Sequence, residues 1–428
     1  MKPYSQFEKT ELIVLKSTLF DKYSEYKAKN HKLDMSRGKP GADQLDLVTD
    51  MLTILKTNRD CFAQDGTDCR NYGALDGIPE AKRLFAELFD VSIDEVLVGG
   101  NSSLNMMFDT IARAMSFGVL GSEKPWGKYD KIKFLCPVPG YDRHFTICQY
   151  FGIEMINIEM NSDGPDMNEV ERLAASDDTI KGIWCTPKYS NPDGITYSDK
   201  VVRRFASLKP AAKDFRIFWD NAYIVHDLSD DKDTLLNIMD ECKKEGNTDI
   251  VFEFVSTSKI SFTGAGVAAM AASADNLAQI KKIIFAQTIG PDKLNQLRHA
   301  KYFKNIQGIN EQMKKHAAIL KPKFDVVLNK LNSEFEGLGI AAWNSPKGGY
   351  FISFNTIEGC AKRTLSLLKD AGVNMTPAGA TFPYGKDPKD RNIRIAPTFP
   401  PLGELKTAID IFCLCVKIAS LEKILENK

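Results

Sequence analysis

Between residues 96 and 272, short apolar runs alternate with segments of helical periodicity, and this alternation constrains the fold more than any other feature. Most of the apolar runs are separated by helical segments, namely Leu104–Phe117, Tyr141–Phe151, Met167–Ala175, Ser198–Leu208 and Thr234–Lys244. The runs themselves suit buried strands and comprise Val96–Val98, Ile132–Cys136, Glu154–Ile158, Gly182–Cys185, Arg216–Trp219, Ile250–Val255 and Val267–Ala272. The alternation predicts an α/β domain built on a mostly parallel, seven-stranded sheet.

The pattern changes after about Pro291. A long helical stretch runs to Asn332, and short strands are expected near 340–343, 350–354, 373–376 and 393–396. Helices are also expected at 8–29, 45–56, 79–89, 360–371 and 402–425. A chain of 428 residues exceeds the usual size of one domain. We therefore predict a large α/β domain over 60–305 and a smaller α+β domain formed by 1–59 and 306–428.

Composition excludes several classes of function. Lys plus Arg and Asp plus Glu each number 56, so no positive surplus favours nucleic acid as a partner. The nine cysteines are odd in number and include no C-x-x-C pair, which argues against a disulfide framework or a zinc site and favours reduced thiols. The chain shows no secretory signal pattern and no run near the roughly 20 apolar residues of a membrane span. We expect a cytoplasmic protein without a membrane partner or a bound metal.

A lysine follows one of the expected strands. The segment Ser256-Thr257-Ser258-Lys259 comes after the apolar run IVFEFV and before the small-residue stretch ISFTGAG. A strand end that faces a cleft desolvates an amine and lowers its pKa, as a lysine nucleophile requires. The hydroxyls on either side can donate to a phosphate. The plainer interpretation, a solvated lysine after a strand, stands if this segment is taken alone.

Three further polar segments also follow strands. Asp220 ends the strand in FRIFWDNAY, with Tyr223 one turn later, and a carboxylate there can pair with a protonated pyridine nitrogen. Asn191 lies in the turn NPDG, where its amide can hold a phenolate oxygen. Gly99-Gly100-Asn101-Ser102-Ser103 opens a helix, whose free amides and hydroxyls form an anion site. Taken alone, each segment has a plainer interpretation as a turn or a cap, and for Asp220 alone that interpretation is favoured.

Taken together and in this order, the segments resemble the fold-type I enzymes that use pyridoxal 5'-phosphate (PLP), in particular the class I aminotransferases. The resemblance extends from Arg37-Gly38 to Arg394. The short sequence motifs are most similar to those of the bacterial type Ic aspartate aminotransferase subgroup. The motifs that carry it are RNYGALDG, VGGNSS, PVPGYDRHF, NPDG, STSKISFTGAG and NIRIAPTFP. It implies transfer of an amino group between an amino acid, aspartate or glutamate, and a 2-oxoacid, by way of a Lys259 aldimine and pyridoxamine phosphate.

The resemblance also implies roles for single residues. Lys259 binds the cofactor and moves the proton, Asp220 pairs with the pyridine nitrogen, and Tyr223 and Asn191 contact the phenolic oxygen. Tyr141 stacks on the ring. The phosphate is expected to contact Asn101, Ser102, Ser103, Ser256 and Ser258.

Tyr72 matches a tyrosine that reaches the phosphate of the neighbouring subunit, which implies a homodimer. Arg394 matches the arginine that holds the substrate α-carboxylate, with Gly38 and Asn191 beside it. Guanidinium suits this task because it binds a carboxylate through two parallel hydrogen bonds. The group that reads a second, distal carboxylate stays open among Arg37, Arg143, Lys188 and Arg298.

One departure from the family pattern keeps other activities in view. Many class I enzymes have a phosphate-binding arginine shortly after the lysine, whereas ISFTGAGVAAM contains none. A β-lyase or decarboxylase on the same fold is therefore the main alternative. An aminotransferase-like regulator is disfavoured, because only about 60 residues precede the α/β region and they are not strongly basic.

Overall fold

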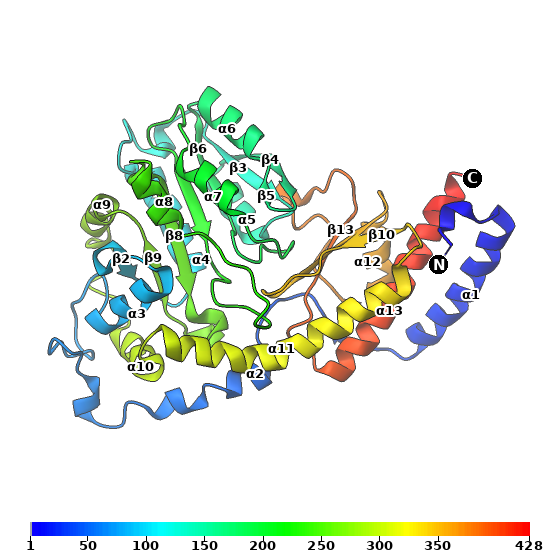
Figure 1. The fold of residues 1–428 in the computed structure, drawn as a ribbon, viewed down its shortest axis with the longest axis horizontal. Coiled ribbons are helices and arrows are strands. Elements are labelled where there is room, and N and C mark those ends of the chain that lie inside the picture. Colours follow the sequence, from blue (N-terminus) through cyan, green and yellow to red (C-terminus); the bar gives the residue numbers. More distant parts are fainter. Residues whose placement is uncertain (1) are drawn as a thin grey trace.

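A central sheet dominates the computed structural model of the chain, which describes residues 2–428 (Figure 1). Its eight strands run in the order β2-β9-β8-β7-β6-β3-β4-β5. Neighbouring strands from β4 to β8 are parallel, whereas β9 is antiparallel to both β2 and β8. The strands are β2 (Val96–Val98), β3 (Lys133–Val138), β4 (Glu154–Asn161), β5 (Gly164–Pro165), β6 (Ile180–Cys185), β7 (Arg216–Asp220), β8 (Val251–Ser256) and β9 (Ala268–Ala271).

The prediction of a mostly parallel sheet is confirmed, and its strand count is corrected from seven to eight. The additional strand, β5, pairs antiparallel with the end of β4 over only two residues. Gly164 and Pro165 form no apolar run that could signal a strand in the sequence, so their pairing depends on the turn that follows β4.

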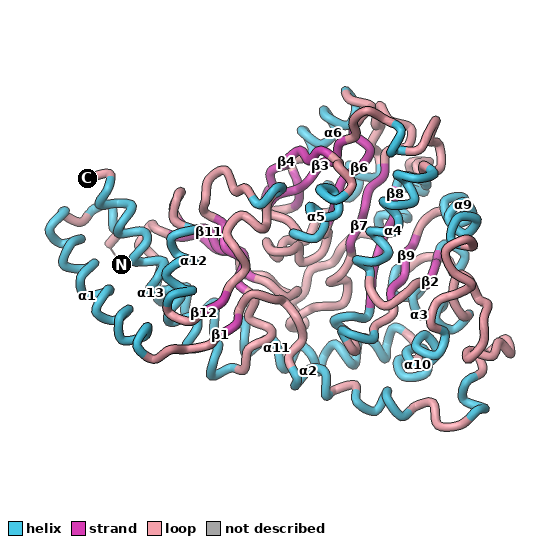
Figure 2. The backbone as a smooth tube through the Cα atoms, turned by 180° about the vertical axis from the view of Figure 1, so that it is seen from behind, coloured by secondary structure: helices cyan, strands magenta, loops and turns pink. Residues whose placement is uncertain are grey.

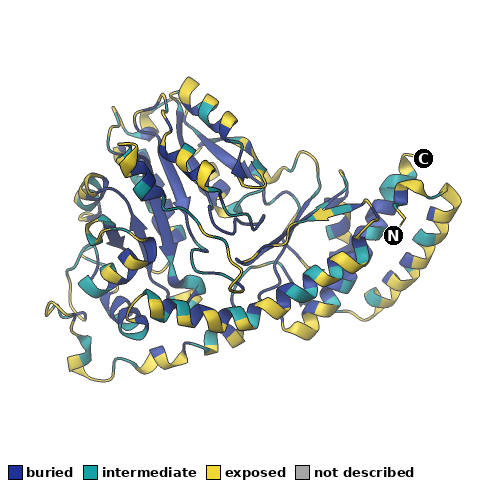
Figure 3. Ribbon diagram, in the orientation of Figure 1, coloured by how far each residue is buried: buried dark blue, intermediate teal, exposed yellow. Residues whose placement is uncertain are grey.

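Helices cover both faces of this sheet, and buried strands lie between them (Figure 3). Alternation along β7 assigns its side chains, because Phe218 packs in one core cluster and Ile217 and Trp219 pack in another. The cluster of Phe218 includes α4 (Ser103–Phe117), α5 (Asp142–Tyr150) and α9 (Ala274–Ile284). The cluster of Trp219 includes α6 (Met167–Ser176), α7 (Asp199–Ala206) and α8 (Ile238–Lys244).

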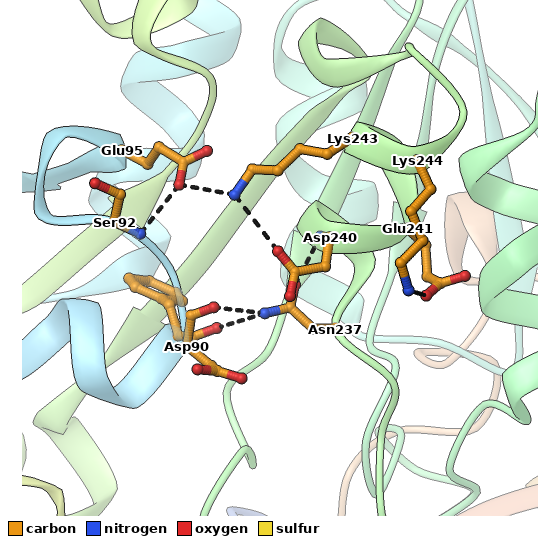
Figure 4. Close-up of polar contacts among 9 residues, drawn as sticks. Asp90, Ser92, Glu95, Asn237, Asp240, Glu241, Lys243 and Lys244 are labelled. Carbon is orange, nitrogen blue, oxygen red and sulfur yellow. Dashed lines mark hydrogen bonds and ion pairs between the residues drawn. The ribbon is translucent and has the colours of Figure 1, made fainter.

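Polar contacts join the end of α3 (Pro79–Phe89) to α8 (Figure 4). Asn237 caps α8, and its Nδ2 donates to the carbonyl oxygen of Asp90 at 2.7 Å. Lys243 Nζ lies 3.0 Å from a Glu95 carboxylate oxygen and 3.5 Å from Asp240 Oδ1. These contacts join α8 to the segment between α3 and β2.

A second, smaller group of elements lies beside the central sheet (Figure 2). It contains the antiparallel sheet β10-β11-β13 and the parallel pair β1-β12, which share a hydrophobic core with the helices around them. The strands are β1 (Leu33–Asp34), β10 (Ala341–Trp343), β11 (Ile352–Thr356), β12 (Val373–Asn374) and β13 (Asn392–Ile395). The helices are α1 (Lys9–Ala28), α11 (Ile306–Phe335), α12 (Ala361–Asp370) and α13 (Leu402–Glu426). The domain limits at 59/60 and 305/306 stay predictions.

Two expected helices are interrupted. The stretch from about 291 to 332 forms α10 (Lys293–Phe303) and α11, because Lys304 takes a φ of +67° and Asn305 caps the second helix. The expected helix over 45–56 is replaced by α2 (Ala42–Asp46) and a 3-10 turn at Thr49–Thr53, since the backbone leaves helical geometry at the buried Val48.

Two observations bear on the surroundings of the chain. All nine cysteines are unpaired, and all but Cys61 are buried. From residue 2 to residue 428, no helix combines the length and the apolar character needed to cross a membrane.

Candidate active site

A cavity of about 600 Å³ lies between the carboxyl ends of the central strands and the smaller group of elements. This is the edge of an open α/β sheet at which ligands commonly bind. From the central sheet and its helices the cavity is lined by Tyr141, Asn191, Asp220, Tyr223 and Lys259. From the other side it is lined by Gly38, Phe351, Thr376 and Arg394. Tertiary structure thus brings most of the predicted site residues into one space.

Asp220, the last residue of β7, is buried and only partly paired. Its Oδ2 lies 3.0 Å from His144 Nε2, and the His144 ring stacks on Trp184 with centroids 4.4 Å apart. Its Oδ1 is buried and has no hydrogen-bond partner in residues 2–428. Because buried polar atoms are normally paired, this oxygen matches a cationic donor such as a protonated pyridine nitrogen.

His144 was not among the site residues predicted from the sequence. It lies three residues after Tyr141 in the segment PGYDRHF, and the two rings meet edge to face with centroids 5.0 Å apart. That spacing, one turn of a helix, was the available signal. The contact with Asp220 could not be read from the segment, because it joins residues 76 positions apart.

Lys259 ends the 3-10 turn Thr257–Lys259 that follows β8. Its Nζ lies 5.0 Å from the centroid of the Tyr223 ring and 5.8 Å from that of Tyr350. Burial lowers the pKa of the Lys259 amine, the Asp220 carboxylate opposes this shift, and the Arg394 guanidinium adds to it. A larger share of the amine is therefore neutral and nucleophilic than for an exposed lysine.

Tyr223 and Asn191 offer two hydrogen-bonding groups to a ligand oxygen. Burial, together with the nearby Tyr141 and Asp220, holds the pKa of the Tyr223 phenol well above its usual range, so the phenol keeps its proton and can donate it. Asn191 is buried, and its Oδ1 accepts a hydrogen bond from Arg394 Nη1 at 3.2 Å. This leaves the Asn191 amide nitrogen as a donor.

The predicted phosphate residues meet at the start of α4. Ser258 Oγ lies 3.4 Å from the carbonyl oxygen of Asn101 and 3.0 Å from Ser256 Oγ, which joins the loop after β2 to the loop after β8. Ser102 caps α4, and Ser103 is its first residue. Of the five predicted phosphate residues, only Ser103 lines the cavity. Asn101 and Ser102 precede Ser103 in the chain, and Ser256 and Ser258 precede Lys259. Residues 260–266 contain no basic side chain, and the groups gathered here are hydroxyls and the backbone amides at the start of α4, which suit an anion.

Arg394 on β13 is only 7% exposed and makes three side-chain hydrogen bonds. Its Nη1 donates to Asp142 Oδ1 at 2.9 Å as well as to Asn191, and its Nη2 donates to Thr376 Oγ1 at 3.2 Å. Asp142 and Thr376 were not predicted as site residues. Thr376 is 18 positions and Asp142 is 252 positions away from Arg394 in the chain, and neither local pattern indicates a contact with this arginine.

Gly38 lies where no side chain fits. A Cβ atom on Gly38 would be 2.3 Å from Phe351 Cζ, and the Phe351 ring in turn lies 4.7 Å from the Arg394 guanidinium carbon. Glycine therefore lets the chain approach the ring that supports the guanidinium. Tyr72, in contrast, does not line the cavity, and it is 79% exposed.

The four residues considered for binding a second, distal carboxylate of the substrate fall into two groups. Arg37 and Arg143 line the cavity, and no carboxylate of residues 2–428 forms an ion pair with either. Lys188 does not line it and is paired with Asp227 at 2.8 Å. Arg298 also lies outside the lining.

Comparison with known proteins places this chain among the aminotransferases. A crystal structure of an aspartate transaminase from Corynebacterium glutamicum matches with a TM-score of 0.95 and 43% identity, covering 98% of this chain and 99% of that one. A multiple substrate aminotransferase from Thermococcus profundus shares the fold, with a TM-score of 0.74, 17% identity and 96% of each chain covered.

The chain belongs to the aspartate aminotransferase family, whose sequence profile matches residues 7–428. An aspartate aminotransferase of C. glutamicum is 45% identical over 401 residues, which are 94% of this chain and 92% of that protein. The resemblance inferred from the sequence motifs is thereby confirmed.

Proposed function

We propose that this protein is a PLP-dependent aminotransferase that exchanges an amino group between aspartate or glutamate and a 2-oxoacid. The observation that carries the proposal is one cavity holding a desolvated lysine, a buried carboxylate with an unpartnered oxygen, and a buried arginine. Membership of the aspartate aminotransferase family supports the choice of substrates.

The residues present fit the cofactor. Asp220 Oδ1 would accept from the pyridine nitrogen, Tyr223 and Asn191 would donate to the phenolic oxygen, and the serines at the start of α4 would hold the phosphate. When bound, the cofactor supplies an electron sink for a substrate held next to it. In its neutral form the Lys259 amine would attach the cofactor and would then be placed to move a proton at the substrate Cα.

Arg394 is suited to hold the α-carboxylate that every amino-acid substrate shares. A bidentate guanidinium fixes the orientation of the substrate, so the Cα–H bond is directed for removal of its proton. Of the four candidates for binding the side-chain carboxylate of the substrate, only Arg37 and Arg143 line the cavity, so we propose that one of these two arginines binds it. Replacing the correct one should reduce turnover of aspartate and spare alanine.

The proposal includes a homodimer in the cytoplasm. The exposed Tyr72 phenol lies outside the cavity of its own chain, as expected if it serves the phosphate site of a second copy. The unpaired cysteines favour a reducing compartment such as the cytoplasm.

Single-turnover product analysis tests the proposed reaction. The cofactor-loaded protein should convert one equivalent of aspartate to oxaloacetate and retain the amino group until a 2-oxoacid is added. With cysteine in place of aspartate, release of hydrogen sulfide, ammonia and pyruvate would instead identify a β-lyase. Formation of alanine or β-alanine together with carbon dioxide from aspartate would identify a decarboxylase.

A further inference from the structure

Arg394 is already paired with a carboxylate of its own chain. Asp142 belongs to the first turn of α5, beside the central sheet, whereas Arg394 lies on β13 of the smaller sheet. The ion pair, 2.9 Å long, therefore spans the cavity wall between the two groups of elements. The Arg394 side chain is 7% exposed and that of Asp142 is 30% exposed, so the acid is the more accessible partner.

The guanidinium atoms that Asp142 and Thr376 contact are the two that a carboxylate would use. A bidentate carboxylate can bind the pair of terminal nitrogens of an arginine. Here Nη1 contacts Asp142 and Nη2 contacts Thr376, while Nε is buried without a partner among residues 2–428. An incoming carboxylate at Nη1 and Nη2 must displace Asp142 or share Nη1 with it.

We propose that Asp142 is an internal competitor for the carboxylate site of Arg394 and sets the affinity of that site. In the absence of substrate, its charge compensates a buried guanidinium, which would be costly to leave unpaired. When a substrate carboxylate binds, it takes over this role and Asp142 is released. The competition weakens carboxylate binding and speeds release of product. The inference rests on the proposed function, because it assumes that Arg394 binds substrate.

Two other roles for Asp142 make different predictions. An acidic residue in the first turn of a helix is favoured by the helix dipole alone, and in that role it would leave ligand affinity unchanged. A residue needed only to orient Arg394 would weaken ligand binding when replaced. Only an internal competitor predicts tighter binding after its charge is removed.

The test is calorimetric titration of the cofactor-loaded protein with maleate, a dicarboxylate that cannot be transaminated. Asp142→Asn keeps an oxygen acceptor at the same place and removes the charge. Because hydrogen bonds to charged groups contribute about 1.5–3 kcal/mol, the dissociation constant of maleate should fall about tenfold or more. The maleate-induced rise in Tm should be larger than in the wild type, since the unliganded variant leaves Arg394 unpaired.

Three further variants make the result specific. Asp142→Glu keeps the charge and should not tighten binding. Asp227→Asn removes an acid that pairs with Lys188 outside the cavity lining, so it should leave maleate affinity unchanged. Arg394→Gln should abolish maleate binding. Asp142→Ser replaces Asp142→Asn as the charge-removing variant if the latter does not fold.

The outcomes separate the inference from the proposed function. Unchanged or weaker maleate binding in the charge-removing variant, with binding lost in Arg394→Gln, overturns the role of Asp142 and leaves the proposed function intact. Equal maleate binding by the wild type and Arg394→Gln overturns both the role of Asp142 and the assignment of Arg394 as the carboxylate site, whereas the proposed reaction is tested separately by the single-turnover products.

Discussion

Replacement of Arg394 by lysine tests the assignment of the α-carboxylate site. The guanidinium uses both terminal nitrogens, reaching Asp142 and Asn191 with Nη1 and Thr376 with Nη2. A lysine ammonium is a single point on a flexible chain and cannot reproduce this fork. At least one charge-assisted hydrogen bond to substrate is lost, worth about 1.5–3 kcal/mol, which corresponds to a fall in kcat/KM of about ten- to two-hundredfold.

The assay compares aspartate and alanine as amino donors with the same 2-oxoacid. Because both share the α-carboxylate, Arg394→Lys should lower kcat/KM by a similar factor for each. Arg391→Lys serves as a matched control, since Arg391 is three residues away and does not line the cavity. If Arg394→Lys damages turnover of aspartate and spares alanine, Arg394 reads the side-chain carboxylate and the assignment is reversed.

Four more predictions concern other parts of the chain. Asp220→Asn should reduce turnover about a hundredfold or more, because a neutral amide no longer stabilises a protonated pyridine nitrogen, and loss of one preorganised electrostatic contact typically costs about 10²–10³ in rate; near-normal turnover would contradict its role. Lys259→Ala should bind the cofactor without a covalent link and fail to transaminate, and borohydride reduction of the wild type followed by peptide mapping should label Lys259 and no other lysine. Sedimentation should show a dimer at assay concentration, and Tyr72→Phe should weaken cofactor binding without dissociating it; a fully active monomer refutes the composite site. Burial raises the pKa of Glu253 from 4.5 to about 7, so its contribution to stability is complete below pH 4.5 and is lost as the pH rises through about 7. Glu253→Gln should therefore match the wild type near pH 4.5 and exceed its free energy of unfolding by up to about 3 kcal/mol at pH 8, and equal stability of the two proteins at pH 8 would show that Glu253 is not held in its protonated form.

Local patterns in the sequence predicted the elements that bury apolar side chains. The run before Asp220 and the run before Lys259 became β7 and β8, parallel neighbours in the sheet. A parallel sheet covered on both faces requires continuous apolar strands, and that requirement is visible in short windows. It also implied that polar residues at the strand ends share one edge of the sheet, which is why Asp220 and Lys259 could be proposed together.

The sequence gives weaker signals for breaks between helices and for very short strands than for long apolar strands. The break between α10 and α11 occurs at Lys304 and Asn305, neither of which is a glycine or a proline. The two-residue strand β5 is too short for any periodicity. Residue propensity is a weak guide in both places, because one depends on a local break in the backbone and the other on the turn that follows β4.

The sequence by itself determined the class of fold and the family, and it predicted Lys259 and Asp220 as site residues, because each of these inferences rests on short segments with their own chemistry. Only the tertiary structure decided which groups those residues meet. Arg394 contacts Asp142 across 252 positions, and Asp220 contacts His144 across 76. Such pairs leave no trace in local periodicity, since the affinity of a buried charge for its partner acts only after folding has removed water from both and brought them within hydrogen-bond distance.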